Sequence, residues 1–250
     1  MIIVAGGDSF VWGDELAGVT YLEHSNTVIP ALLAKELNLE YRCAARAGNS
    51  NDAIARMTMA ACEQALLEQT ELAVLVMWTF PFRYEFNFNY PISSPISPWA
   101  SLNPNNTKAE IEDFANYFFK HVGSNDIYQN YNTLRSIVVL QAYLKTKNIP
   151  YLFTLADNRI FDTFDDVNLK LLMDIIDQDN WYLFPPGQGA NQTETPRGFY
   201  QWAVENKYNV GPGHHPLEDA HCDAADLIRS KFNELVEKYN QQNQIRNSLS

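Results

Sequence analysis

A serine and a histidine that could act together lie near opposite ends of this 250-residue chain. Ser9 follows two glycines and an aspartate that end the apolar run 2–5, and His215 stands in the segment "GPGHHP". A serine hydroxyl is a weak nucleophile at neutral pH and needs a base within hydrogen-bond reach. The pair therefore predicts nucleophilic catalysis, with Ser9 as the nucleophile and His215 as its base.

Hydrogen-bond donors for a developing negative charge are also present in the sequence. An attacked carbonyl oxygen becomes an oxyanion, which backbone N–H groups and side-chain amides stabilise. Ser9 offers its own N–H, and Gly48 in "AGNSN" lets a second segment bring an N–H close without a side-chain clash. Asn49, Asn51 and Thr79 are candidates for a further donor, and we expect one of the two asparagines to supply it.

These motifs occur in the order typical of the SGNH (GDSL-type) hydrolases, which the chain resembles from Gly7 almost to its final helix. "GDS" resembles the motif of the nucleophilic serine, "AGNSN" resembles the oxyanion-hole glycine motif, and "HP" at His215 resembles the catalytic histidine block. "GDSFVWG", "AGNSND" and "WTFPFR" together resemble a divergent subgroup of small SGNH-like proteins with phage and bacterial members. The resemblance implies a flavodoxin-like fold and the activity of a carboxylic ester hydrolase.

Two positions depart from the family pattern. The family's usual oxyanion asparagine belongs to a G-x-N-D motif after the third strand, where this chain reads "WTFPFR". The usual aspartate three residues before the catalytic histidine is here Pro212. A backbone carbonyl in "VGPG" could accept the imidazole proton instead, so we expect a Ser-His dyad and a slow or specialised enzyme.

The expected reaction is the hydrolysis of an acyl ester through an acyl-enzyme on Ser9, without a cofactor. The polar and aromatic loops, together with the family resemblance, favour a short acyl group such as acetyl on a carbohydrate or another polar carrier. The alternative is a catalytically impaired SGNH-like scaffold that serves as a binding or structural protein of a phage. The departures at the oxyanion asparagine and at the acid favour that alternative.

Several residues near the motifs are candidates for substrate binding. They are Asp8, Trp12, Trp78, Thr79, Arg83, Glu85 and His214. Aromatic residues after a buried strand more often belong to the core. Two opposite charges beside an apolar strand end are costly unless they are paired or used, so Arg83 and Glu85 are either an ion pair or substrate ligands. His214 is either a loop residue or an alternative base.

Histidines, acids and a cysteine also gather in the segment 214–223. No pair there has a recognised ligand spacing, so we expect no metal. His221 shares a helical face with Leu217 and Ala224, which indicates a buried histidine that supports the last helix.

Composition excludes several functional classes. The formal net charge of −12 provides no basic field, so we expect no nucleic-acid partner. Three cysteines without a C-x-x-C spacing fit a reducing compartment. Neither a signal peptide nor a membrane span is visible, so we expect a cytoplasmic protein, or a virion-associated one if a phage encodes it. The oligomeric state is left open.

Alternating strands and helices must position these residues. Apolar runs predict strands at 2–5, 40–45, 71–78, 150–157 and 181–184, and helical spacing predicts helices within 28–39, 52–65, 108–122, 126–147, 167–176 and 216–239. Such alternation is typical of a three-layer α/β/α domain with a parallel sheet of about five strands. We expect one domain over 1–240 and a frayed tail over 241–250. Because ligands bind at the carboxyl ends of such strands, the loops after the first three should form the site.

Overall fold

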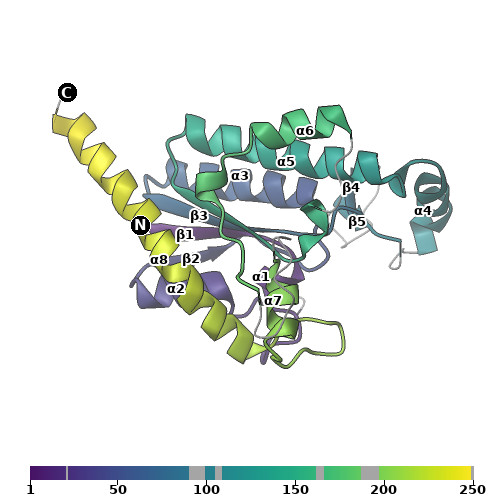
Figure 1. Ribbon diagram of the computed structural model, residues 1–250, viewed down its shortest axis with the longest axis horizontal. Helices are drawn as coiled ribbons and strands as arrows, with labels where there is room; N and C mark the ends of the chain where they lie inside the picture. Colours follow the sequence, from purple (N-terminus) through teal and green to yellow (C-terminus); the bar gives the residue numbers. More distant parts are fainter. Residues whose placement is uncertain (21, 90–98, 105–108, 162–165, 187–196, 249–250) are drawn as a thin grey trace.

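The computed structural model describes the chain except for residues 21, 90–98, 105–108, 162–165, 187–196 and 249–250. Its centre is a sheet of four strands in the order β2-β1-β3-β6, and every neighbouring pair is parallel. The strands are β1 (Ile2–Gly6), β2 (Glu40–Cys43), β3 (Leu72–Trp78) and β6 (Tyr151–Leu155). Helices cover both faces of this sheet (Figure 1). The predicted three-layer α/β/α fold is confirmed.

Both faces of β1, β3 and β6 are buried, which explains their continuous apolar runs. Along β1, Ile2 and Val4 pack into one core, whereas Ile3 and Ala5 pack into the other. Successive side chains of a strand point to opposite faces, so each run supplies two cores at once.

Each face of the sheet is covered by its own set of helices (Figure 1). One layer contains α3 (Asn51–Leu67), α5 (Asp126–Thr146) and α6 (Val167–Asp174). The other contains α2 (Ile29–Glu36), α7 (Phe199–Glu205) and α8 (Glu218–Ser248). The helix α3 begins at the cap Ser50, whose hydroxyl accepts a hydrogen bond from the N–H of Ala53.

The expected fifth strand at 181–184 is reduced to single bridges. Trp181 forms one parallel bridge to Phe153, and the N–H of Tyr182 donates to the carbonyl of Phe153 over 2.8 Å. Two prolines follow at 185–186, and because proline lacks the N–H that a ladder needs, the pairing does not continue.

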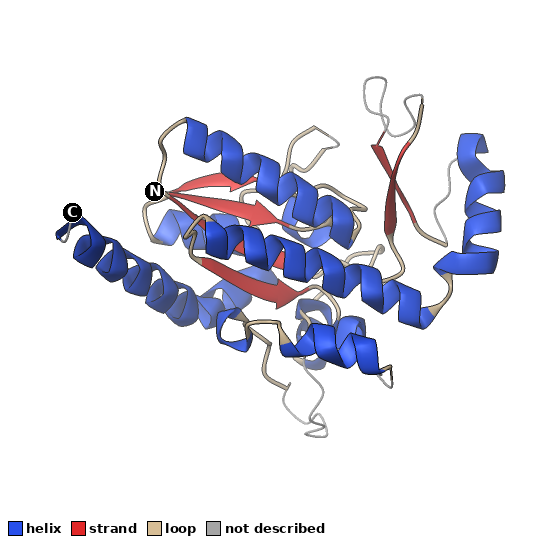
Figure 2. Cartoon of the chain, turned by 90° about the horizontal axis from the view of Figure 1, so that it is seen from above, coloured by secondary structure: helices blue, strands red, loops and turns tan. Residues whose placement is uncertain are grey.

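A small antiparallel sheet forms in a stretch that the sequence pattern suggests to be a loop. It pairs β4 (Tyr84–Asn87) with β5 (Trp99–Leu102) and stands apart from the main sheet beside α4 (Glu112–Phe118), as Figure 2 shows. Short turns of other helix types flank α4 at 109–111 and 119–123. Two further short 3₁₀ helices lie at 158–161 and 178–180.

The C-terminal helix α8 is longer than the pattern predicts, since it continues to Ser248 through most of the expected tail. Much of the expected loop at 185–198 lies outside the described residues. Within the described ranges, no helix is long and apolar enough to cross a membrane.

The connections that follow the strands emerge at one edge of the sheet. The register pairs Gly6 with Val76 and Trp78 with Leu155, so β1, β3 and β6 end side by side. Both β2 and β3 are neighbours of β1, one on each side. The chain therefore extends the sheet in one direction from β1 to β2 and in the opposite direction from β3 onward, so the strand order reverses at β1. In open parallel sheets, ligands bind at the carboxyl edge near such a reversal.

Candidate active site

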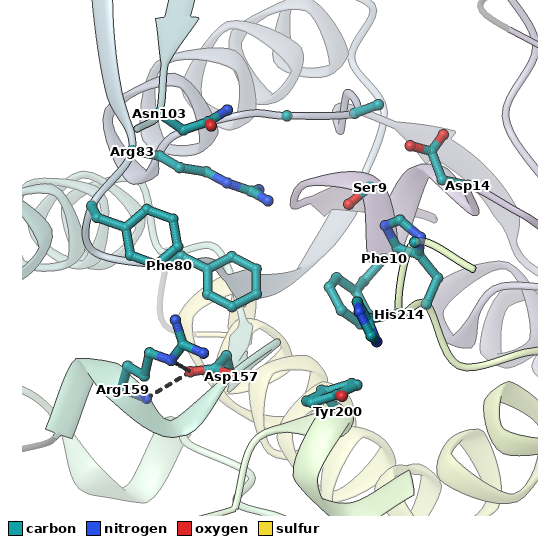
Figure 3. A pocket seen from close by; sticks show the side chains of 15 residues that line it. Ser9, Phe10, Asp14, Phe80, Arg83, Asn103, Asp157, Arg159, Tyr200 and His214 are labelled. Atoms are coloured by element: carbon teal, nitrogen blue, oxygen red, sulfur yellow. Dashed lines mark hydrogen bonds and ion pairs between the residues drawn. The ribbon is translucent and has the colours of Figure 1, made fainter. Parts of the chain in front are cut away.

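A pocket of about 620 Å³ opens at this carboxyl edge. Segments that lie far apart in the sequence form its wall, and Figure 3 shows most of their side chains around one hollow. The lining residues are Ser9, Phe10, Asp14, Ala47, Gly48, Phe80, Phe82, Arg83, Asn103, Asp157, Arg159, Tyr200, Gly213, His214 and His215. The structure therefore brings both predicted catalytic residues and the oxyanion glycine to the same place.

Ser9 is the first residue of the short helix α1 (Ser9–Trp12) and is 4% exposed. The side chain of Asp8 caps this helix by accepting a hydrogen bond from the N–H of Phe10 over 3.0 Å. The Ser9 hydroxyl itself makes no hydrogen bond to a residue that the structure describes. Ser9 lies in the pocket wall.

The backbone N–H groups of Ser9 and Gly48, both at the pocket, have no partner among the described residues. Gly48 has a φ of +77°, in the left-handed region that favours glycine, and no atom lies within 4 Å of the place where a Cβ would stand. Glycine is therefore required here for its backbone conformation. The two donors suit an oxyanion.

His215 is held in a tight turn just before α8. The N–H of Gly211 donates to the carbonyl of His215 over 2.9 Å, and Val210 and Pro216 form an antiparallel bridge. The imidazole ring lies 5.1 Å from the ring of Phe10, centroid to centroid. Because Phe10 directly follows Ser9 in the chain, this contact places His215 beside the nucleophile segment.

The Nδ1 atom of His215 lies 2.8 Å from Oε2 of Glu15. A carboxylate only accepts, so Nδ1 carries the proton and Nε2 is the nitrogen available as a base. Glu15 also accepts hydrogen bonds from the N–H of Gly213, at 2.7 Å, and from the N–H of His215, at 3.3 Å. The expected backbone carbonyl is thus replaced by a carboxylate, and the prediction of a dyad is corrected to a histidine with an acidic partner.

The surroundings of Glu15 favour its ionised form. Burial by itself would raise the pKa of Glu15, but the hydrogen bonds from Gly213 and His215 outweigh burial and lower that pKa. Glu15 has a φ of +69°, a left-handed conformation that costs a non-glycine residue ~1–2 kcal/mol. A Cβ on Gly211 would stand 2.5 Å from the Glu15 carboxylate, so the glycine in "VGPG" leaves room for this side chain.

A second acid, Asp14, lines the same pocket. Burial raises its pKa, and the nearby charges of Asp8 and Glu15 raise it further, whereas those of His215 and Arg83 lower it. Asp14 and Ala47 also line a neighbouring hollow of about 450 Å³.

Asp8 is fully buried at the centre of a polar network. Its Oδ2 accepts hydrogen bonds from the hydroxyl of Thr79 over 2.5 Å and from Nη1 of Arg83 over 2.8 Å. Thr79 is fully buried as well. Asp8 and Thr79 therefore position their neighbours, and of these three only Arg83 lines the pocket.

The two asparagines of the second loop are both committed to the backbone of other segments. Nδ2 of Asn49 donates to the carbonyl of Gly7 over 3.0 Å. Asn51 bonds Thr79 twice, because its Nδ2 donates to the carbonyl over 3.0 Å and its Oδ1 accepts from the N–H over 2.9 Å. Neither asparagine lines the pocket. These hydrogen bonds connect the loops that follow β1, β2 and β3.

The remaining predicted ligands lie in different surroundings. Trp78 is fully buried in the core, and Trp12 lines the neighbouring hollow with its Nε1 donating to a backbone carbonyl. Glu85 does not pair with Arg83, since Arg56 holds it through hydrogen bonds of 2.9 and 2.6 Å. His214 is exposed on the pocket rim, with its ring 6.4 Å from that of Tyr200.

His221 lies behind the site and is 1% exposed, as its position on the helical face predicts. Its Nδ1 accepts a hydrogen bond from the N–H of Ile29 over 3.4 Å. Burial, with a smaller contribution from the charge of His215, lowers the pKa of His221 to about 3. It is a neutral histidine that joins α8 to α2.

Several residues in or beside the pocket are not among those that the sequence predicts. Glu15 is foremost, and its signal stood in the first motif, where "GDEL" follows Ser9 by four residues. On the opposite side of the pocket, Asp157 is 2% exposed and accepts hydrogen bonds from Gln201 and from the backbone of Arg159. The guanidinium of Arg159 lies 5.5 Å from the ring of Phe80 (Figure 3).

In the described part of the chain, no group of three or more histidine, cysteine, aspartate or glutamate side chains could hold a metal ion. The cluster expected from the segment 214–223 divides, with His214 at the pocket and His221 in the core.

Comparison with solved structures finds esterases of low sequence identity. The chain is similar to a psychrotrophic esterase from Pseudoalteromonas sp., with 12% identity, a TM-score of 0.46, and coverage of 96% of this chain and 98% of that one. It is similar to a carbohydrate esterase family 2 enzyme with a carbohydrate-binding domain from Corynascus thermopiles (Myceliophthora fergusii), with 11% identity and a TM-score of 0.49, over 94% and 66% of the two chains. An acetyl xylan esterase from the rumen bacterium Butyrivibrio proteoclasticus gives 12% identity and a TM-score of 0.45, over 92% and 64%.

No curated protein matches the sequence. One family profile does match, over residues 17–227, a range that begins after Ser9 and Glu15 and includes Arg83 and His215. The chain therefore belongs to DUF6071, a family of unknown function.

Proposed function

We propose that this protein is a serine esterase that hydrolyses an acyl ester through a covalent intermediate on Ser9. The observation that carries the proposal is the 2.8 Å contact between Nδ1 of His215 and the carboxylate of Glu15, in a pocket that Ser9 also lines. An acid that fixes the tautomer of a histidine beside a serine is the arrangement that activates a serine hydroxyl.

In the proposed mechanism, the Ser9 hydroxyl attacks the ester carbonyl and passes its proton to Nε2 of His215. The N–H groups of Ser9 and Gly48 stabilise the oxyanion. His215 then gives the proton to the leaving alcohol, and the acyl-enzyme forms. Water, deprotonated by the same nitrogen, then attacks the acyl-enzyme. The bond to Ser9 breaks, Nε2 of His215 returns the proton to Oγ of Ser9, and the acid leaves.

Glu15 acts through His215. Its ionised carboxylate holds the imidazole in the reactive tautomer and stabilises the imidazolium that forms when the Ser9 proton is transferred. The free Ser9 hydroxyl is compatible with this role, since catalytic hydrogen bonds are often long in ligand-free sites and tighten when substrate binds.

The pocket supports a small acyl group on a polar carrier, such as an acetylated carbohydrate. Its wall combines the rings of Phe80, Phe82 and Tyr200 with the charged side chains of Asp157 and Arg159. A mixture of apolar faces and a few polar groups is typical of sites that bind ligands with both kinds of surface.

Labelling with a fluorophosphonate probe, read by intact mass, tests the proposal. We expect one adduct on the wild type and none on Ser9→Ala or His215→Ala. If the wild type forms no adduct under conditions that label a known serine hydrolase, the esterase proposal is wrong. The pocket would then belong to a binding or structural scaffold, for which glycan and protein binding assays are the next measurement.

A further inference from the structure

The oxyanion site of this chain has no side-chain amide where one is expected. Three side chains could have supplied the third donor, but each is already engaged. Asn49 donates to the carbonyl of Gly7, Asn51 donates to the carbonyl of Thr79, and the hydroxyl of Thr79 donates to Asp8. None of the three is therefore free to donate to a substrate oxygen.

Arg83 is anchored between the two segments that supply the backbone donors. Its Nη1 lies 2.8 Å from Oδ2 of Asp8, the residue before Ser9. The same Nη1 lies 3.4 Å from the carbonyl oxygen of Asn49, the residue after Gly48. These contacts tie the guanidinium to the chain neighbours of both Ser9 and Gly48.

Of the three guanidinium nitrogens, Nη1 makes the hydrogen bonds described above, and Nη2 is the one left to face the pocket that Arg83 lines. Its Nε is buried and has no hydrogen-bond partner, and among the described residues Nη2 has none either. Arg83 lines the pocket with a side chain that is 15% exposed, and Figure 3 shows it extending toward Ser9. Its guanidinium also lies 4.7 Å from the ring of Phe80, which limits its movement.

We propose that Arg83 is the third oxyanion donor of this site, in place of the neutral amide usual in such hydrolases. The inference rests on the esterase function proposed above. Nη2 donates to the carbonyl oxygen of the substrate as that oxygen becomes negative, while Nη1 stays on Asp8. No proton or electron pair moves to or from Arg83, which remains protonated throughout.

The pairing with Asp8 explains how a full charge can occupy this position. An unpaired buried cation would be costly, and Asp8 balances the charge from the side away from the pocket. A donor that is already oriented needs no rearrangement as the oxyanion forms. Loss of one such donor typically lowers kcat by ~10²- to 10³-fold.

The test compares hydrolysis of p-nitrophenyl acetate by the wild type, Arg83→Lys and the double variant Asp8→Asn/Arg83→Met. The double variant removes both charges, which avoids leaving the Asp8 carboxylate buried and unpaired, and Asp8→Asn alone reports the effect of the acid. We expect kcat to fall ~10²- to 10³-fold in the double variant, with KM little changed, and to fall less in Asp8→Asn. In Arg83→Lys, which keeps the charge but not the forked guanidinium, kcat should lie between those of the wild type and the double variant.

Arg56→Met is the matched control, because Arg56 also holds a largely buried carboxylate, that of Glu85, but does not line the pocket. Its kcat should equal that of the wild type. A correctly folded double variant with wild-type kcat overturns the inference while the proposed function stands. Asn103→Ala removes the side-chain amide that lines the pocket wall. If Asn103→Ala lowers kcat ~10²- to 10³-fold and the double variant does not, the inference is likewise overturned while the proposed function stands. A wild type that forms no fluorophosphonate adduct overturns both proposals.

Discussion

Replacement of Glu15 by glutamine tests whether the Glu15 carboxylate helps His215 to activate Ser9. The change keeps the size of the side chain and an oxygen that can accept from the N–H of Gly213, but it removes the charge beside Nδ1 of His215. The fold should therefore remain while the imidazolium formed during attack loses its partner.

The size of the effect follows from the contact and its exposure. The Nδ1 to Oε2 distance is 2.8 Å, and the Glu15 side chain is 23% exposed. Unit charges about 4 Å apart attract by ~1 kcal/mol in water and by ~4 kcal/mol at an effective dielectric constant near 20. Since each ~1.4 kcal/mol is tenfold in rate, the lost charge costs ~10- to 10³-fold.

Loss of the tautomer adds to this charge effect. A glutamine can present its NH₂ to Nδ1 and so favour the form in which Nε2 carries the proton, which is the wrong form for a base. In triad enzymes the acid-to-amide change lowers kcat by ~10⁴-fold. For the partly exposed Glu15 we expect the fluorophosphonate labelling rate of Ser9 to fall by ~10²- to 10³-fold.

Glu218→Gln is the matched control for Glu15→Gln. Oε1 of Glu218 accepts a hydrogen bond from the N–H of Ala17 over 2.9 Å, so it anchors the same loop but does not touch His215. It should label at the wild-type rate. If Glu15→Gln also labels at that rate while His215→Ala does not label, the carboxylate has no part in activating the serine, and the reasoning from the 2.8 Å contact is refuted.

Three further outcomes follow from the packing and the buried groups. Gly7→Ala should lower the free energy of unfolding in urea by ~1–3 kcal/mol, because the added Cβ would meet Cγ2 and Cβ of Val11 at 2.3 and 2.6 Å; an unchanged midpoint would contradict this packing. Burial lowers the pKa of His221 from 6.5 to about 3, so between these pH values the imidazole binds a proton only in the unfolded chain. The free energy of unfolding should therefore fall as the pH falls, by up to ~1.4 kcal/mol per pH unit and by about 5 kcal/mol in all. His221→Asn should flatten this dependence in urea unfolding measured from pH 7 to 3, and an unchanged slope would exclude His221 as its source. A thiol reagent should modify the exposed Cys222 well before Cys62, which is buried and whose pKa burial raises to about 12; equal rates in native protein, followed by mass spectrometry, would refute that burial.

The positions of the strands in the chain and their parallel arrangement were predictable from the sequence. The apolar runs at β1, β3 and β6 are long and continuous because both faces of these strands are buried, and this pattern is local. Ser9 and Gly48 follow two of the parallel strands, so their place at the same carboxyl edge is also a consequence of local pattern.

The short sheet of β4 and β5 could have been recognised in part. The run "YEFN" alternates aromatic and polar residues, which is typical of a half-buried strand. Prolines and serines around it suggest a loop instead, and its partner β5 is separated from it by a stretch outside the described residues. Pairing between distant segments is not encoded in either segment alone.

The sequence by itself determined the fold class and indicated Ser9 and the histidine segment as the candidate site, because each of these depends on residues that are neighbours in the chain. The tertiary structure decided which charges meet. Glu15 reaches His215 across 200 positions of sequence, and Arg83 reaches Asp8 across 75. Such pairs depend on how two loops approach each other in space, and neither loop shows a periodic pattern that fixes its path. For this reason the sequence suggests that a carbonyl of "VGPG" accepts the imidazole proton of His215. In the folded protein, the glycine of this segment instead leaves room for the Glu15 carboxylate.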